Sequence, residues 1–139
     1  MTSNRAMIRI ALRFLLASLY IYAGYRHIID PAPFVRITPE AVPLRDAVVF
    51  WTGMAEITGA IALAQPFSRR LMQAGGVALA LYALCVWPAN VNHMLMDMAR
   101  DDGGWGMGYH VPRMFAQPLL IWLALWTGRV VDWPFKPQR

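Results

Sequence analysis

Long runs of apolar residues, separated by short polar turns rich in proline and glycine, dominate this chain. Four runs, at about 7–29, 46–65, 71–96 and 111–131, are long enough to cross a bilayer as helices, which takes roughly 20 mostly apolar residues. A closed barrel, the other way to span a membrane, needs more strands than 139 residues supply. The pattern predicts one all-α domain over residues 1–139, a bundle of four transmembrane helices.

The first run resembles a secretory signal because basic residues precede it, but no Ala-x-Ala cleavage site closes it. We interpret it as a retained transmembrane helix. Arg9 and Arg13 lie near its start, and we expect their side chains to snorkel toward the lipid headgroups. The segment Asp30-Pro31-Ala32-Pro33 should end this helix in a turn, since proline cannot continue one.

Composition agrees with lipid as the solvent and excludes two classes of function. Hydrophobic residues make up 58% of the chain and charged residues only 15%, against about 25% in ordinary soluble domains. The net charge is +5, but the basic residues are scattered at helix ends and form no stripe, so we expect no nucleic-acid partner. Cys85 is the only cysteine, which excludes an intramolecular disulfide and any thiol–disulfide mechanism within the chain.

The distribution of Lys and Arg predicts the orientation. Four spans put both termini and the 66–70 turn on one side, with eight basic residues: Arg5, Arg9, Arg13, Arg69, Arg70, Arg129, Lys136 and Arg139. The other side has five: Arg26, Arg36, Arg45, Arg100 and Arg113. The positive-inside rule therefore places both termini in the cytoplasm. We expect a multi-pass protein of a bacterial cytoplasmic membrane.

Polar residues recur at helical spacing in the outer half of each predicted span. Because polar groups in hydrocarbon turn toward the bundle interior, these stripes should meet in a pocket. The carboxyl we expect to be catalytic is Glu56, and the ligand-binding candidates are Tyr20, Arg26, His27, Asn90, His93, His110, Arg113 and Gln117.

Glu56 lies about ten residues into a span of roughly twenty, near the bilayer centre. A charged carboxylate there costs on the order of 3 kcal/mol or more. It is therefore either protonated or paired with a cation, for which Arg26, Arg113 and a protonated histidine are the candidates. Two interpretations stay open: a carboxyl that handles protons or binds a ligand, and a buried hydrogen bond that holds helices together.

Two further readings concern the histidines and asparagines. Imidazole and carboxylate could bind zinc or iron, but His27, Glu56, His93 and His110 show no metal-ligand spacing, and we assign no metal site. Asn90 and the neighbouring Asn92 could satisfy a carbonyl that Pro88 frees. Alternatively, Asn90 and His93 hold the oxygen of a quinone-like headgroup.

Three segments, in this order and spacing, resemble the DoxX family of small four-helix membrane proteins. They are Tyr22-Ala23-Gly24-Tyr25-Arg26-His27 before Pro31, Gly53-Met54-Ala55-Glu56-Ile57-Thr58-Gly59 before Pro66-x-x-Arg69-Arg70, and Trp87-Pro88-Ala89-Asn90-Val91-Asn92-His93-Met94. The resemblance covers about residues 7–128. It implies a four-helix bundle and an association with quinone-linked redox chemistry, and it implies nothing about His110.

These observations favour a quinone-associated redox subunit, with quinone as the expected ligand. The chain has no haem-binding pair, flavin motif or cysteine pair, so a partner must supply electrons. We expect other membrane or redox subunits, or further copies of the chain, as partners. The alternative is a non-catalytic accessory subunit that stabilises a larger membrane complex. A small transporter is less favoured, because four helices leave little room for a pore and no inverted repeat is present.

Overall fold

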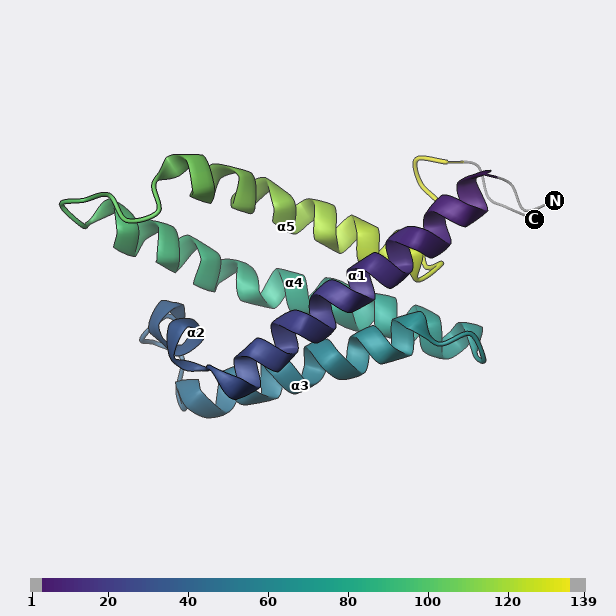
Figure 1. The fold of residues 1–139 in the computed structure, drawn as a ribbon, viewed down its shortest axis with the longest axis horizontal. Coiled ribbons are helices and arrows are strands. Elements are labelled where there is room, and N and C mark those ends of the chain that lie inside the picture. Colours follow the sequence, from purple (N-terminus) through teal and green to yellow (C-terminus); the bar gives the residue numbers. More distant parts are fainter. Residues whose placement is uncertain (1–3, 136–139) are drawn as a thin grey trace.

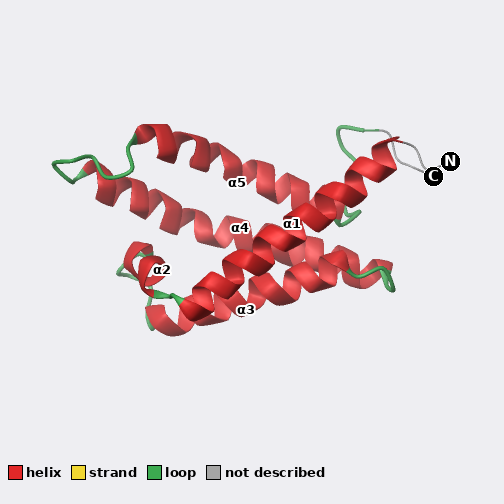
Figure 2. Ribbon diagram, in the orientation of Figure 1, coloured by secondary structure: helices red, strands yellow, loops and turns green. Residues whose placement is uncertain are grey.

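The computed structural model describes residues 4–135, and this part of the chain folds into helices without strands (Figure 1 and Figure 2). The helices are α1 (Asn4–Ile29), α2 (Ala32–Ile37), α3 (Arg45–Ala64), α4 (Arg69–Met98) and α5 (Met107–Thr127). The predicted all-α class is confirmed, and each predicted span overlaps one long helix. The short α2 was expected as a turn. It forms because its prolines occupy the first helical turn, where a missing N–H costs nothing.

The four long helices run along the long axis of the molecule, and neighbours along the chain pack antiparallel (Figure 1). The main contacts join α1 to α3, α3 to α4 and α4 to α5, while α1 and α5 touch over a smaller area. Helices α3 and α5 are thus diagonal in the bundle. α2 and the 99–106 loop lie at one end, and the 65–68 connection lies at the other, near the first residues of α1 (Figure 1).

Small residues let the helix backbones approach closely. A Cβ atom on Gly75 of α4 would lie 2.5 Å from the Leu63 amide nitrogen of α3, and one on Gly76 would lie 2.7 Å from the Ala124 carbonyl oxygen of α5. Between these contacts lies an apolar core whose fully buried members include Leu16, Leu63, Leu79 and Ala124. Close backbone approach is the usual way in which membrane helices associate.

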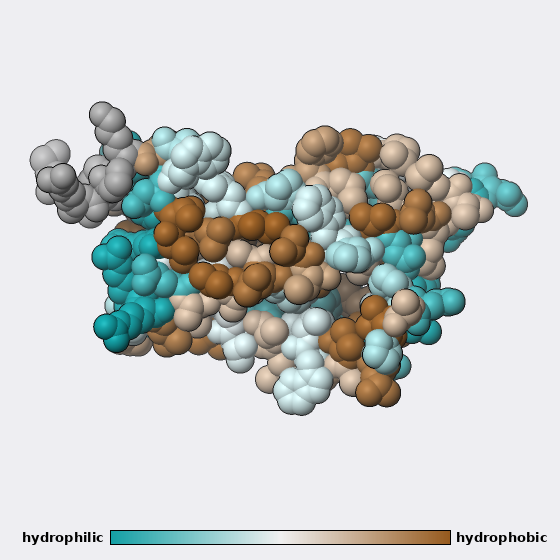
Figure 3. Space-filling model, turned by 180° about the vertical axis from the view of Figure 1, so that it is seen from behind, coloured by the Kyte–Doolittle hydropathy of each residue, from teal (hydrophilic) through white to brown (hydrophobic). Residues whose placement is uncertain are grey.

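Most of the apolar surface points outward. α1, α3 and α4 are long and apolar enough to cross a membrane, and at most 33% of each apolar segment is buried within the chain. α5 has 21 residues and is not one of these three helices, and its first half carries the polar side chains of His110, Arg113 and Gln117. On the face in Figure 3, hydrophobic residues fill most of the middle and hydrophilic residues gather at both ends. This distribution fits three helices that could cross a membrane.

Arg9 and Arg13 do not snorkel, contrary to the sequence-based expectation. They are 5% and 6% exposed and hold the end of α5. Arg9 Nε donates to the Trp126 carbonyl at 2.6 Å, and Arg13 Nε donates to the Thr127 carbonyl at 2.9 Å. The last carbonyls of a helix have no partner within it, and a cation suits the negative end of its dipole. α5 ends at Thr127 rather than at 131, because Gly128 forms its C-cap and Arg129 takes a left-handed backbone conformation with φ of 59°.

Candidate functional site

The site begins where α1 and α3 cross. A Cβ atom on Gly24 would lie 2.5 Å from the Gly53 carbonyl oxygen, and one on Gly53 would lie 2.7 Å from His27 Cβ. Only glycine fits at such a crossing. The two backbones therefore come close enough to set His27 of α1 beside Glu56 of α3.

His27 and Glu56 form a buried pair. Nδ1 of His27 lies 3.1 Å from Oε2 of Glu56, within ion-pair distance, but neither atom makes a hydrogen bond of good geometry. Tyr82 of α4 lies beside the same carboxyl group in the pocket wall. The predicted partners of Glu56 were Arg26, Arg113 and a histidine, and the one that lies beside it is the histidine, His27. A proton shared between imidazole and carboxyl keeps the pair neutral overall, as its burial requires.

Beside this pair lies a pocket of about 440 Å³, bounded by α1, α2, α3, α4 and α5. Its walls are mostly apolar, and its polar lining residues are Tyr20, Tyr22, His27, Thr38, Glu56, Tyr82, Asn90, Arg113 and Gln117. Leu19 and Tyr22 of α1 line it while remaining 54% and 61% exposed, so the pocket reaches the outer surface of the bundle. An apolar cavity with a few convergent polar groups is the usual form of a small-molecule site.

Four side chains that line the pocket have buried polar atoms without a hydrogen-bond partner. They are the Tyr20 hydroxyl, His27 Nδ1, Glu56 Oε2 and Gln117 Oε1, and their residues are only 3–8% exposed. Buried polar groups in proteins are nearly always paired, because each unpaired one costs about 1–3 kcal/mol. His27 Nδ1 and Glu56 Oε2 face each other at 3.1 Å, so the Tyr20 hydroxyl and Gln117 Oε1 are the two atoms of this set that have no facing polar group.

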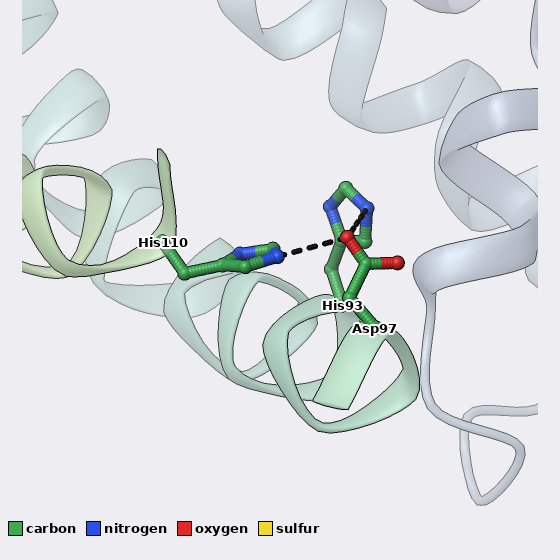
Figure 4. Close-up of side chains that lie close together, drawn as sticks. All are labelled: His93, Asp97 and His110. Atoms are coloured by element: carbon green, nitrogen blue, oxygen red, sulfur yellow. Dashed lines mark hydrogen bonds and ion pairs between the residues drawn. The ribbon is translucent and has the colours of Figure 1, made fainter. Parts of the chain in front are cut away.

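A second polar cluster lies at the end of the bundle that carries the 99–106 loop (Figure 4). His110 Nε2 lies 2.9 Å from Asp97 Oδ2, and His93 Nε2 lies 3.6 Å from the same oxygen on its other side. The loop also folds back onto Asp97. Trp105 N–H donates to Oδ2 at 2.9 Å, and Gly104 leaves no room for a Cβ against the carboxyl group. One carboxylate thus organises the ends of α4 and α5 and the loop between them.

The rest of the loop contains a separate ion pair. Arg100 donates from Nε and Nη2 to the two carboxylate oxygens of Asp102, at 2.8 and 2.7 Å. This fork holds the pKa of Asp102 well below its usual value. At a pH above the ordinary pKa of aspartate, the ionised Asp102 therefore stabilises the folded loop. This stabilisation is lost as the pH falls through the lowered pKa of Asp102. Because both side chains are exposed, the pair shapes the loop and contributes little to global stability.

Asp97→Asn should loosen the loop. The amide presents N–H groups to donors that now point at a carboxylate, so the contacts from Trp105 and His110 weaken. We expect proteolysis within residues 99–106 to accelerate by roughly fivefold or more, because a local loss of stability of about RT ln 5 raises the population of the open loop by that factor. The matched control is Asp101→Asn, an exposed carboxylate of the same loop, which should leave the cleavage rate unchanged. Equal rates for both variants would contradict this role of Asp97.

The structure separates the predicted site residues into groups. Those that line the pocket are Tyr20, His27, Glu56, Asn90, Arg113 and Gln117. His93 and His110 belong to the Asp97 cluster instead. Arg26 does not line the pocket, because it pairs with Asp30 at 2.8 Å one turn further along the chain.

Sequence reasoning did not select Tyr82, Thr38 or Asp97 as site residues. Tyr82 and Asp97 share the α4 stripe with Asn90 and His93, and the His93-x-x-x-Asp97 spacing was a usable signal because residues four apart meet on a helix. Thr38 lies beyond α2, which was expected as a turn, so no pattern pointed to it. Asn92, considered for the carbonyl freed by Pro88, donates to the Ile37 carbonyl of α2 at 2.8 Å.

The four residues weighed for a metal do not come together as one set. His27 pairs with Glu56, while His93 and His110 flank Asp97. Ligand atoms of His93, Asp97 and His110 do lie within 4.8 Å of one another, which brings two imidazoles and a carboxylate to one point. Arg113 Nη1, however, lies 2.8 Å from His93 Nδ1, so a cation already contacts this group.

Comparison with known proteins adds a family. No curated protein and no solved structure matches the chain. The family described as a domain of unknown function, DUF8561, matches residues 16–128, which include the pocket and the Asp97 cluster. Because this match spans most of the sequence, the protein belongs to the DUF8561 family.

Proposed function

We propose that the chain crosses a bacterial cytoplasmic membrane four times, with both termini on the cytoplasmic side. α5 supplies the fourth span, since it packs antiparallel to α4 and, with 21 residues, is as long as the 20-residue α3. The excess of Lys and Arg on the side of the termini supports this orientation. Two residues of that count, Lys136 and Arg139, lie outside the described residues. The pocket then lies in the outer half of the bundle, within reach of the lipid.

In this membrane the pocket binds a lipid-soluble ring compound of the quinone type. The observation that supports this most is that the Tyr20 hydroxyl and Gln117 Oε1 are buried without a partner on the wall of a mostly apolar cavity, beside the His27–Glu56 pair. A quinone ring has apolar faces and two carbonyl oxygens at opposite ends, which can accept from Tyr20 and from a protonated Glu56. The exposed rim at Leu19 and Tyr22 gives such a ligand a path from the bilayer.

The protein then acts as a quinone-associated redox subunit, as its resemblance to the DoxX family implies. Reduction of a quinone consumes two electrons and two protons. The electrons come from a partner subunit or substrate, because this chain has no redox cofactor motif and a single cysteine. Glu56, with His27 beside it, supplies one of the two protons to the quinone oxygen at the pocket wall, and solvent supplies the second and reprotonates Glu56.

The test is the quinone content of purified Glu56→Gln protein. The amide keeps the shape of the side chain but holds no transferable proton, and its N–H groups clash with the donors around it. We expect bound quinone, extracted and quantified per mole of protein, to fall about tenfold, which corresponds to the loss of one buried hydrogen bond. Thr58→Val, an exposed position on the same helix, should keep the content of the unmodified protein.

Equal quinone content in Glu56→Gln and Thr58→Val would contradict the proposal that this pocket binds quinone. The remaining alternative would be the non-catalytic accessory subunit. In that case the His27–Glu56 pair serves to hold α1 against α3, and Glu56→Gln would lower stability without changing the quinone content.

A further inference from the structure

Arg113 is a cation at the pocket wall without a carboxylate partner. It lines the pocket from α5, and within residues 4–135 no carboxylate lies within ion-pair distance of its guanidinium group. One nitrogen, Nη1, contacts His93 Nδ1 at 2.8 Å, and the group lies over the Tyr109 ring at 5.5 Å. A guanidinium has five N–H donors, so most of them remain for a ligand.

The contact with His93 fixes both side chains. Arginine can only donate, so His93 Nδ1 must accept, and in the neutral imidazole the proton then lies on Nε2. That Nε2–H faces Asp97 Oδ2, which also accepts from His110 and from the Trp105 amide. The Asp97 cluster therefore orients His93, and His93 orients Arg113 toward the pocket.

The same proton assignment argues against a metal ion at this cluster. A metal on His93 Nε2 would need the lone pair there and the proton on Nδ1, where it would oppose the Arg113 donor. Arg36 and Arg113 also both act on His93 as nearby positive charges, which repel a cation. The cluster holds a cationic side chain at the pocket wall, and the positive charge of that side chain, Arg113, favours an anion in the pocket.

We propose that Arg113 binds an anionic oxygen on the ligand headgroup, so that the pocket selects weakly acidic, membrane-soluble ring compounds, such as hydroxyquinones, over neutral ones. This inference rests on the proposed function and adds a charge preference to it. Glu56 does not oppose the anion, because it comes from α3, diagonal to α5, and shares its proton with His27. One end of the ring then meets Arg113, and the other end meets Glu56.

Two matched probes test this preference. A 3-alkyl-2-hydroxy-1,4-naphthoquinone is ionised at neutral pH, because its hydroxyl group is a vinylogous carboxylic acid, and its 2-methoxy ether is the neutral counterpart. In titrations of the full chain in lipid nanodiscs, we expect the acid to bind about tenfold or more tightly than the ether, as a charge-assisted contact allows. Arg113→Gln should abolish this ratio by weakening only the acid. Arg26→Gln, a cation outside the pocket, should preserve it.

The outcomes separate the two proposals. Equal affinities for acid and ether in the unmodified protein, or a ratio that survives Arg113→Gln, would overturn the role of Arg113 and leave the ring-binding pocket in place. Binding of neither probe would remove the proposed function itself. The comparison of the two probes on the unmodified protein needs no variant, so it stays decisive even if Arg113→Gln folds poorly.

Discussion

Gly24→Leu should destabilise the protein by about 3 kcal/mol or more, the upper range for a side chain forced into a filled interface. Gly24 lies at the crossing of α1 and α3, where even a Cβ atom would come 2.5 Å from the Gly53 carbonyl oxygen and 2.9 Å from Ile57 Cγ1. The first obstacle is backbone, so the clash cannot be relieved by a rotamer change. The helices must separate, and unfolding in detergent followed by circular dichroism measures the loss.

The separation should also reach the functional pair. His27 Nδ1 lies 3.1 Å from Glu56 Oε2 only because the backbones meet at Gly24 and Gly53, so bound ligand should fall together with stability. Gly108→Leu is the matched control, since a Cβ atom at that helical glycine would meet nothing within 4 Å. A Gly24→Leu protein as stable as Gly108→Leu would show that the two helices do not cross where we describe.

Arg9→Met should cost about 3 kcal/mol, as expected when one partner of a buried charged contact is removed. Arg9 donates to the Trp126 carbonyl at 2.6 Å and to the Val131 carbonyl at 3.0 Å, and its Nη1 pairs with Asp132 at 2.9 Å. Methionine fills the space but donates to neither carbonyl and leaves Asp132 without its cation. Thermal unfolding in detergent reports the loss, and limited proteolysis should show early cleavage after α5.

Arg69→Met provides the comparison for Arg9→Met. Arg69 is exposed at the first turn of α4, at the same end of the bundle, so its removal should change stability by less than about 0.5 kcal/mol. Similar losses in both variants would mean that Arg9 acts through net charge rather than through the carbonyls of α5.

The long helices could be predicted from the sequence because lipid imposes a simple requirement, an apolar run of sufficient length. The four predicted segments each overlap a helix, but the polar stripes meet in two places, since part of them lines the pocket while His93 and His110 meet at Asp97. Tyr20, Glu56 and Gln117 meet at the pocket from three helices, since a polar group in hydrocarbon has only the interior to face.

What the sequence could not provide are contacts between distant segments. Hydropathy does not distinguish an arginine that snorkels from one that caps a neighbouring helix, and the partner of Arg13 is Thr127, 114 residues away. Asp97 looked like one of several acids near the outer surface. Its role depends on a loop that folds back so that Gly104 and Trp105 contact it, and no periodic pattern encodes that path.

Native mass spectrometry of the unmodified protein, purified from its own membrane in mild detergent, tests the ring-binding pocket most directly. We expect the single chain to carry a stoichiometric adduct with the mass of a quinone. A chain that is detected without a bound ligand, and only within larger assemblies, would contradict a ligand in the pocket. The polar side chains would then be contacts that hold the helices together.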